Sequence, residues 1–506
     1  MTLCILTIID DVTDNVIVTL STTDPVLRVL AAIAICFTLG MVPTRVRAQF
    51  SNPGDSDAFI ERLIIRPSLY PCQGDCPDTT ADHDTNSVCP DLCVTNSQQP
   101  DGGLDWLDEV KVGYDHGIVI ASKRELELNA ARYPYLMRIN GWGQLRHTRT
   151  NFETSDEDLN QLQLKRGRLV FSGTAHNPNL TYFVQLDGRS STGDGVRLLD
   201  YYVGYDFGND QFGLEPGTIV FRTGKYKVPF TMSRWLSGRD FEFSDRSMSS
   251  IFFDVNRSYA VGLYGQTKRL GTPIHWETAL FNGLVTGGAE TGSSGALDNN
   301  FAYSGRLYGY PTGDWGSANL PDLEWHTRLA TRVGCGFASS VIQRSGLIEF
   351  NRLRVADSGA TLANVLPNTV SSYATSLYAI DASLKYRGWS STFEYYFRNI
   401  SDVRGASVPD LFDHGFWFQL GKFIVPGRLE LVARWSRVQG DSGTLGTSDQ
   451  SSEEIAGAVA WYLRKNQIKM VADITHLDGA PINATALDIA PGDRGWLFRS
   501  QMQFAF

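Results

Sequence analysis

The sequence predicts an all-β fold, a transmembrane antiparallel β-barrel of about 16 strands. Three observations lead to this prediction. Glycine (48 residues) and aromatic residues (27 Phe, 20 Tyr and 11 Trp) are abundant, as in proteins built from many strands and turns. Short runs of alternating apolar and polar residues recur from about Tyr135 to the end of the chain. Short joins between runs alternate with long polar ones, which is typical of barrels that cross an outer membrane.

The last run, "WLFRSQMQFAF", shows the alternation most clearly. Trp496, Phe498, Met502, Phe504 and Phe506 share one parity, which only Ser500 interrupts. The other parity holds Leu497, Arg499, Gln501, Gln503 and Ala505. Successive side chains of a strand point to opposite faces, so this strand has one aromatic face and one largely polar face.

Sixteen runs of this kind are present, averaging about 12 residues, close to the length of a tilted strand that crosses a bilayer. They lie near 135–149, 160–174, 179–188, 197–207, 217–227, 258–268, 273–282, 300–309, 323–333, 372–386, 388–399, 414–425, 427–438, 453–464, 467–477 and 495–506.

A secreted, soluble β protein is the alternative, because its strands alternate as well. A soluble sheet keeps charge off its packed face and leaves its outer face polar. Here one face is repeatedly aromatic, while the other carries Arg, Glu, Asp and Gln. A water-filled interior satisfies those charges, so the pattern favours the barrel.

Composition excludes other classes. The formal net charge of −10 argues against a nucleic-acid binder. The sequence contains none of the usual hydrolase, metalloprotease or nucleotide-binding motifs, so we expect no enzymatic activity, no metal and no cofactor. An outer-membrane enzyme or adhesin would need a catalytic constellation or a large external domain, and the sequence shows neither.

The first 48 residues are predicted to be a signal or leader segment. Val29 to Val42 is an apolar run that fits a secretory h-region and is short for a membrane span. Val46-Arg47-Ala48 is a small-x-small cleavage pattern before Gln49. A buried helix is the alternative. We therefore expect a cleaved leader and a mature chain that starts near Gln49.

Residues 49–132 are predicted to form an N-terminal segment that contains a small disulfide-stapled part. Cys72, Cys76, Cys89 and Cys93 form two C-x3-C pairs. Export favours two disulfides, whose connectivity the spacing leaves open. A zinc or calcium site is the alternative, although the spacing suits neither well. Residues 133–506 are the predicted barrel.

The stretch from 160 to 283 resembles the phosphate-selective porin O/P family of Gram-negative outer membranes. The resemblance rests on "LKRGRLVFSG", "YFVQLD", "LLDYYVGYDF", "FRTGKYKVPF", "SDRSM", "NRSYAVGLYG" and "WETALFNG", which occur in family order. It implies a sixteen-stranded barrel, a homotrimer and a connection after the fifth strand that folds inward as a constriction. It also implies passive diffusion of small hydrophilic solutes, with a preference for anions such as phosphate.

Candidate pore or anion-binding residues follow from parity and from this resemblance. Arg166, Arg168 and Arg222 oppose apolar residues and are expected in the lumen. Lys225 and Lys227 match a family element, although strict alternation places them with Phe221 on the lipid side. The predicted inward connection contributes four more arginines, Arg234, Arg239, Arg246 and Arg257, against four acids, Asp240, Glu242, Asp245 and Asp254.

Two further expectations concern partners. Phe506 on the aromatic face resembles the C-terminal signal that the barrel-assembly machinery recognises, so we expect assembly into outer-membrane lipid. The alternative function is a narrow or plugged structural barrel without anion selectivity, in which the cysteine segment blocks the channel or anchors it to another envelope layer.

Overall fold

The computed structural model describes residues 5–11, 15–21, 110–114, 117–122, 135–153, 158–188, 195–267, 272–288, 297–312, 314–356, 359–440 and 451–506. The predicted h-region and the four paired cysteines lie outside these residues, so the leader and disulfide predictions remain predictions. Strands β1 (Ile5–Asp11) and β2 (Asn15–Ser21) pair as an antiparallel hairpin.

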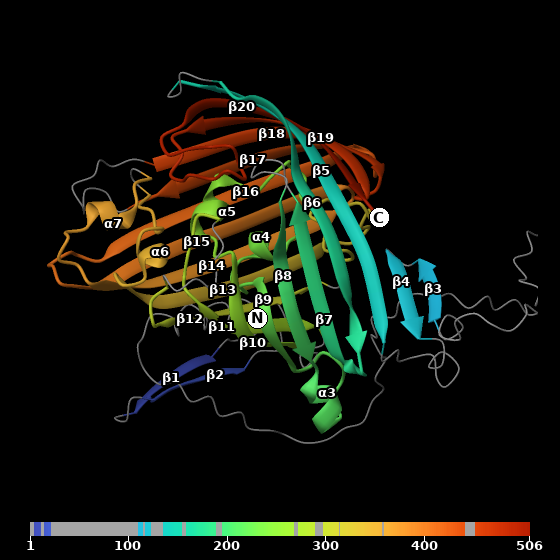
Figure 1. Cartoon of the computed structure of the whole chain (residues 1–506), viewed down its shortest axis with the longest axis horizontal. Helices are drawn as coiled ribbons and strands as arrows, with labels where there is room; N and C mark the ends of the chain where they lie inside the picture. Colours follow the sequence, from blue (N-terminus) through green and yellow to red (C-terminus); the bar gives the residue numbers. More distant parts are fainter. Residues whose placement is uncertain are drawn as a thin grey trace, which may run out of the picture.

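Sixteen strands form the barrel, which confirms the predicted fold class. Each strand from β5 to β19 pairs antiparallel with the next, and β20 closes the barrel on β5 (Figure 1). The strands are β5 (Leu136–Phe152), β6 (Asn160–Ala175), β7 (Asn177–Gly188), β8 (Val196–Tyr205), β9 (Val220–Lys227), β10 (Arg257–Thr267), β11 (Ile274–Asn282), β12 (Phe301–Gly309), β13 (Ala330–Gln343), β14 (Ser372–Tyr386), β15 (Trp389–Arg404), β16 (Leu411–Val425), β17 (Leu429–Gln439), β18 (Ser451–Arg464), β19 (Ile468–Asp478) and β20 (Arg494–Ala505).

Two strands that precede β5 belong to the predicted N-terminal segment. β3 (Val110–Tyr114) and β4 (Ile118–Ser122) form a hairpin. β4 pairs with the first residues of β5, Leu136–Ile139, whereas β20 pairs with β5 from Trp142 to Phe152. The hairpin therefore extends the sheet beside the closing seam.

The two faces of each strand differ as the alternation predicted. In β20, Trp496 and Phe504 are 45% and 50% exposed on the outer face, whereas Arg499 and Gln503 are buried inside. The wall thus has an apolar, aromatic outer surface around a charged interior, which is the arrangement that a barrel in lipid requires.

The closing seam relies on glycines beneath aromatic rings. A Cβ on Gly143 would lie 2.5 Å from Cζ of Phe504, and one on Gly141 would lie 2.9 Å from Cζ of Phe506. Phe506 also exchanges backbone hydrogen bonds with Gly141, at 3.0 and 3.3 Å. The terminal rings therefore cover backbone that glycine leaves bare.

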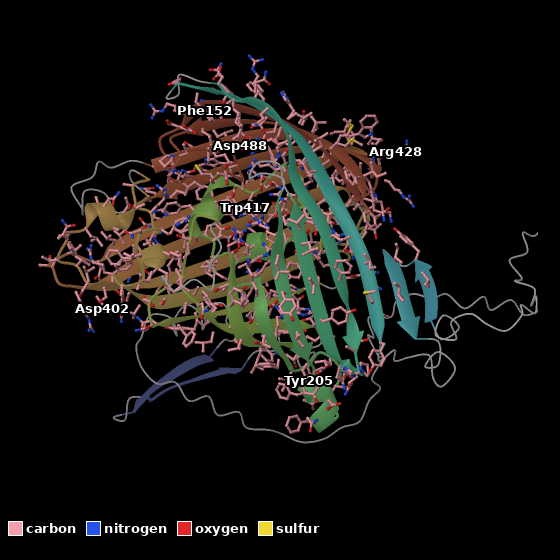
Figure 2. All side chains as sticks on the ribbon, viewed as in Figure 1. Phe152, Tyr205, Asp402, Trp417, Arg428 and Asp488 are labelled. Atoms are coloured by element: carbon pink, nitrogen blue, oxygen red, sulfur yellow. The ribbon has the colours of Figure 1, made fainter. Side chains whose placement is uncertain are left out.

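The connections are mostly short at one end of the barrel, where those between β8 and β9 and between β12 and β13 are the long exceptions, and mostly long at the other. Asp402 marks the loop end and Arg428, in the tight turn between β16 and β17, marks the turn end (Figure 2). Short helices lie in the connections: α3 (Phe207–Phe212), α4 (Met232–Trp235), α5 (Met248–Phe253), α6 (Leu347–Phe350) and α7 (Leu362–Val365).

One predicted strand is wrong in position. The run expected near 323–333 is instead β13, Ala330–Gln343. Its interior positions include Gly334, Gly336 and Ala338, and a Cβ on Gly336 would collide with the carbonyl oxygen of Phe230. The face of β13 that contacts residues 228–256 carries small residues, which are neither strongly apolar nor strongly polar. The alternation of apolar and polar residues is therefore weak in this strand.

Candidate functional site

Residues 228–256, between β9 and β10, bond to side chains that face the barrel interior; we call them the inward segment. Ser244 N–H donates to Asp473 of β19, and Lys469 of the same strand donates to the carbonyl oxygens of Arg239 and Phe241. On the far wall, Arg306 of β12 donates to the carbonyl oxygen of Phe230 at 2.9 Å. The inward segment therefore crosses the interior and is held from several sides.

Wall carboxylates also receive the first N–H groups of the two helices in the inward segment. Glu394 of β15 accepts from the N–H groups of Met232 and Ser233 at 2.7 and 3.1 Å. Glu454 of β18 accepts from Met248 N–H at 2.6 Å. Helix N-terminal N–H groups lack partners within the helix, so a wall carboxylate both satisfies and fixes them.

Asp245 attaches the inward segment to the barrel wall through two ion pairs. Its carboxylate pairs with Arg146 of β5 at 2.9 Å and with Arg166 of β6 at 2.8 Å, and all three side chains are buried. Burial raises the pKa of Asp245, but the charges of Arg166 and Arg146 together outweigh it and hold the pKa well below the ordinary value of 3.8. Asp245 is thus ionised at neutral pH.

A cavity of about 360 Å³ remains between the inward segment and the wall of β5–β9 and β11; we call it the central cavity. Four cationic side chains line it: Arg168, Arg222, Lys227 and Arg239. Two carboxylates, Asp200 and Glu277, also line it. Counted by formal charge, the lining has two more cations than acids, within a chain whose formal charge is −10.

Aromatic faces orient two of these arginines. The guanidinium carbon of Arg168 lies 4.8 Å from the ring centroid of Trp142. That of Arg222 lies 4.0 Å from the ring centroid of Tyr264 and 5.0 Å from that of Tyr226. Each arginine also pairs with a carboxylate, Arg168 with Asp187 at 3.3 Å and Arg222 with Glu277 at 3.5 Å. The rings and these carboxylates together fix the direction of each guanidinium.

The other two cations come from β9 and from the inward segment. Lys227 Nζ donates to the carbonyl oxygens of Trp235 and Leu236 at 3.1 and 3.0 Å. Arg239 is 45% exposed at its side chain and lies 3.6 Å from Asp240. It is the more solvent-accessible partner of that pair, so its charge faces the water of the cavity.

The remaining predicted candidates do not line the central cavity. Arg166 pairs with Asp245, Arg234 with Asp254 at 3.2 Å, and Arg257 with Asp200 at 2.8 Å. Arg246 donates to the carbonyl oxygens of Ser233 and Leu236. Lys225 shares the outward parity of Phe221 and donates to the carbonyl oxygen of Leu198, as strict alternation predicted. These cations secure the inward segment or its surroundings.

Sequence reasoning missed a second cationic group on β12–β14. Arg332 is 2% exposed, and its guanidinium lies 5.0 Å from the ring centroid of Trp235 and 4.9 Å from that of Tyr308. Lys385 Nζ donates to the carbonyl oxygens of Trp315 and Ser317, in the connection between β12 and β13. The interior parity of Arg332 was the available signal, but the misplaced β13 run obscured it.

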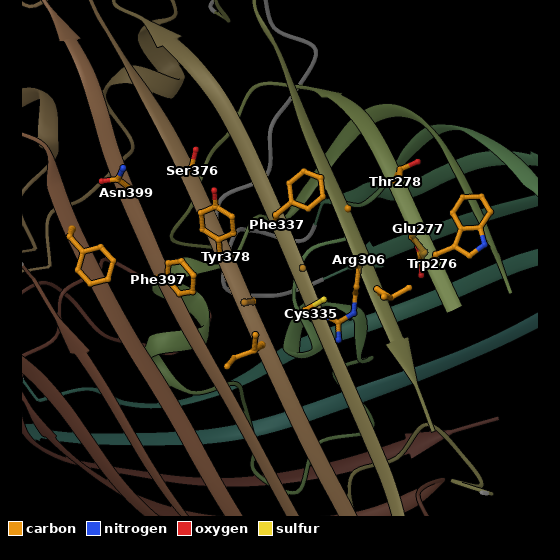
Figure 3. A pocket seen from close by; sticks show the side chains of 16 residues that line it. Trp276, Glu277, Thr278, Arg306, Cys335, Phe337, Ser376, Tyr378, Phe397 and Asn399 are labelled. Atoms are coloured by element: carbon orange, nitrogen blue, oxygen red, sulfur yellow. The ribbon is translucent and has the colours of Figure 1, made fainter. Parts of the chain in front are cut away.

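A cavity of about 640 Å³ lies instead on the outer wall, across β11–β16. Figure 3 shows Phe337, Tyr378 and Phe397 above the strands that form it. These residues have the outward parity, and Phe337 is exposed. Most of the groove therefore faces the surroundings of the barrel, although Arg306 and Glu277 also line it and Glu277 lines the central cavity as well.

Among the described residues, no helix is long and apolar enough to cross a membrane. Within the same part of the chain, no group of three or more His, Cys, Asp or Glu residues is placed to hold a metal ion.

No known family model matches the chain, and no curated protein matches it. Solved structures of similar shape include the anion-selective porin from Comamonas acidovorans, with 12% identity, a TM-score of 0.48 and coverage of 73% of this chain and 99% of that one. The outer membrane channel DcaP of Acinetobacter baumannii has 10% identity and a TM-score of 0.44, covering 73% and 97%. In-vitro folded OmpT of Vibrio cholerae, in trimer form, has 11% identity and a TM-score of 0.44, covering 73% and 99%.

Proposed function

We propose that this protein is an outer-membrane porin through which small hydrophilic solutes diffuse passively, with a preference for anions such as phosphate. The observation that carries the proposal is a closed barrel, apolar outside and charged inside, whose interior holds a cavity lined by four cations and two carboxylates. Cationic side chains in a narrow aqueous passage attract anions, and one guanidinium can donate two parallel hydrogen bonds to two oxygens of a phosphate. The inward segment is the constriction in this proposal.

We also propose where the protein lies and how it assembles: it is inserted in the lipid of the outer membrane. The aromatic outer surface suits lipid, and the terminal Phe506 suits recognition by the barrel-assembly machinery. We propose that the leader at 1–48 is cleaved on export, that Cys72, Cys76, Cys89 and Cys93 form disulfides, and that the barrel assembles as a homotrimer. Cross-linking of the purified protein in detergent tests the trimer, and mass measurement with and without reductant tests the leader and the disulfides.

A planar bilayer tests the channel itself. Under a potassium chloride gradient, the reversal potential should show that chloride permeates better than potassium. Phosphate added afterwards should block the chloride current with saturation, because it competes for the central cavity. Stepwise conductance with weak or cation selectivity would retain the porin and discard the phosphate preference.

A narrow or plugged barrel is the second candidate, and one observation favours it. Besides the inward segment, the connection between β12 and β13 reaches into the interior: Leu320 N–H bonds to the carbonyl oxygen of Asp240, and Asn319 to Asn466. Two segments thus occupy the same passage. Removal of residues 49–110 should leave conductance unchanged if the N-terminal segment anchors the barrel, and raise it if that segment is the plug.

A further inference from the structure

A second polar cavity, of about 300 Å³, lies at the loop end of the barrel; we call it the mouth cavity. Its walls come from three connections, at residues 286–288, 351–354 and 483–486, and Ile251 of the inward segment completes the lining. The mouth cavity therefore adjoins the inward segment at the loop end, where a solute entering from that end meets the protein.

The chemistry of the mouth cavity is that of an anion site. Arg352 and Arg354 line it, and no carboxylate is among the described residues that do. Asn351, Asn483 and a threonine from each of two connections (Thr286 and Thr485) add amides and hydroxyls. Two like charges side by side without a lining acid favour an anion between them.

The walls are fixed by bonds to the barrel, so the mouth cavity has a defined shape. Lys165 of β6 donates to the carbonyl oxygen of Thr485 at 2.9 Å. Arg398 of β15 donates to the carbonyl oxygen of Arg354 at 2.6 Å. Asn256, at the end of the inward segment, donates to the carbonyl oxygen of Gly288 at 2.7 Å. Each of the three connections is thus tied to an interior element.

We propose that the mouth cavity is an entry station that captures an oxyanion carried on a hydroxylated body, the chemistry of a sugar phosphate. The arginines bind the phosphate oxygens, while the amides and hydroxyls bind the hydroxyl groups of the body. A volume of about 300 Å³ is at the lower end of the range for small-molecule sites and exceeds the need of a bare phosphate. This inference rests on the proposed porin function and adds a solute class to it.

The test is block of the chloride current by glucose 6-phosphate, added to each compartment in turn, with inorganic phosphate and glucose as comparison probes. The double variant Arg352→Glu with Arg354→Glu should lower the association rate from one compartment at least tenfold in dilute salt. The effect should largely vanish near 1 M salt, where the Debye length is about 3 Å. Arg404→Glu, an exposed arginine at the same end that does not line the mouth cavity, is the matched control and should leave the rate unchanged.

Asn483→Ala distinguishes recognition of the hydroxyl groups of the solute from recognition of its charge. It should slow glucose 6-phosphate and leave inorganic phosphate unaffected, because only the sugar has hydroxyls for the amide. An unchanged association rate in the double arginine variant would overturn the entry station. Equal effects of Asn483→Ala on both anions, or none on either, would overturn the sugar phosphate class. If the unmodified channel passes no anions, the proposed function itself fails, an outcome distinct from these.

Discussion

Replacing Asp245 with Asn should release the inward segment while leaving the barrel closed. The change removes the charge that neutralises Arg146 and Arg166, both buried against the segment. Leaving a buried charge without its partner costs about 3–5 kcal/mol, which changes the equilibrium between held and released segments by a factor of about 10² to 10⁴. The barrel strands keep their own hydrogen bonds, so the substitution destabilises the held position of the inward segment and not the barrel.

Single-channel recording measures the result. The D245N channel should show a larger mean conductance and greater current noise, because the segment leaves the passage for part of the time. D488N is the matched control: Asp488 also pairs with a wall cation, Lys165 at 2.6 Å, but it lies outside the inward segment. Conductance and noise equal to those of the unmodified channel would refute the account of Asp245 as the main attachment.

The same carboxylate gives a pH dependence with a definite sign. Because its pKa in the folded protein lies well below 3.8, Asp245 stabilises the held segment above pH 3.8 and loses this effect only as the pH falls through its folded value. Conductance of the unmodified channel should therefore stay steady from neutral pH down to about pH 4 as far as this contact is concerned. A rise in noise between pH 7 and pH 5 that D245N abolishes would contradict the stated sign.

Three further predictions follow from single sites. Arg239→Glu changes the charge of the central cavity lining by two units, which at about 6 Å in water alters the energy of a permeating ion by about 1.4 kcal/mol, in opposite directions for cations and anions. The permeability ratio of cation to anion should therefore rise by up to about a hundredfold, read as a shift of the reversal potential, and no shift would place Arg239 outside the ion path. Gly143→Val should impair closure of the barrel, because its side chain would collide with Phe504; loss of the heat-modifiable band on a gel measures this, and restoration by Phe504→Ala would identify the collision as the cause. Burial, with the charge of Asp298, raises the pKa of Glu349 in α6 to about 7, so the stability that its protonated form contributes is lost as the pH rises from 4.5 through 7. The hydrogen-exchange protection factor of Leu284, whose N–H bonds to Glu349, should fall over that window once the intrinsic pH dependence of exchange is divided out, and Glu349→Gln should remove this fall.

Alternation was enough to predict the barrel, because lipid and water impose opposite requirements on the two faces of every strand. Fifteen of the sixteen predicted runs overlap their strands closely; the run at 372–386 coincides with β14. The exception, β13, carries glycine and alanine where the inward segment approaches the wall. A packing constraint between distant segments thus overrode the local pattern.

The site was less predictable than the fold, because parity says which way a side chain points and nothing about what it meets there. A register shift near Leu164 turns both Lys165 and Arg166 inward. Arg166 was predicted for the pore and instead binds Asp245, a residue 79 positions away in the sequence. Arg168 and Arg222 were predicted from the same parity and do line the central cavity. The pairing of each arginine depends on tertiary contacts that alternation does not encode.

The reversal potential of the purified mature protein in a planar bilayer, under a potassium chloride gradient, tests the central claim most directly. We expect discrete conductance steps and a reversal potential of the sign produced when chloride permeates better than potassium. The current should fall on titration with phosphate as the cationic central cavity fills. A channel that prefers potassium, or a chloride current that phosphate leaves unchanged, would contradict the assignment of that cavity as an anion-selective constriction.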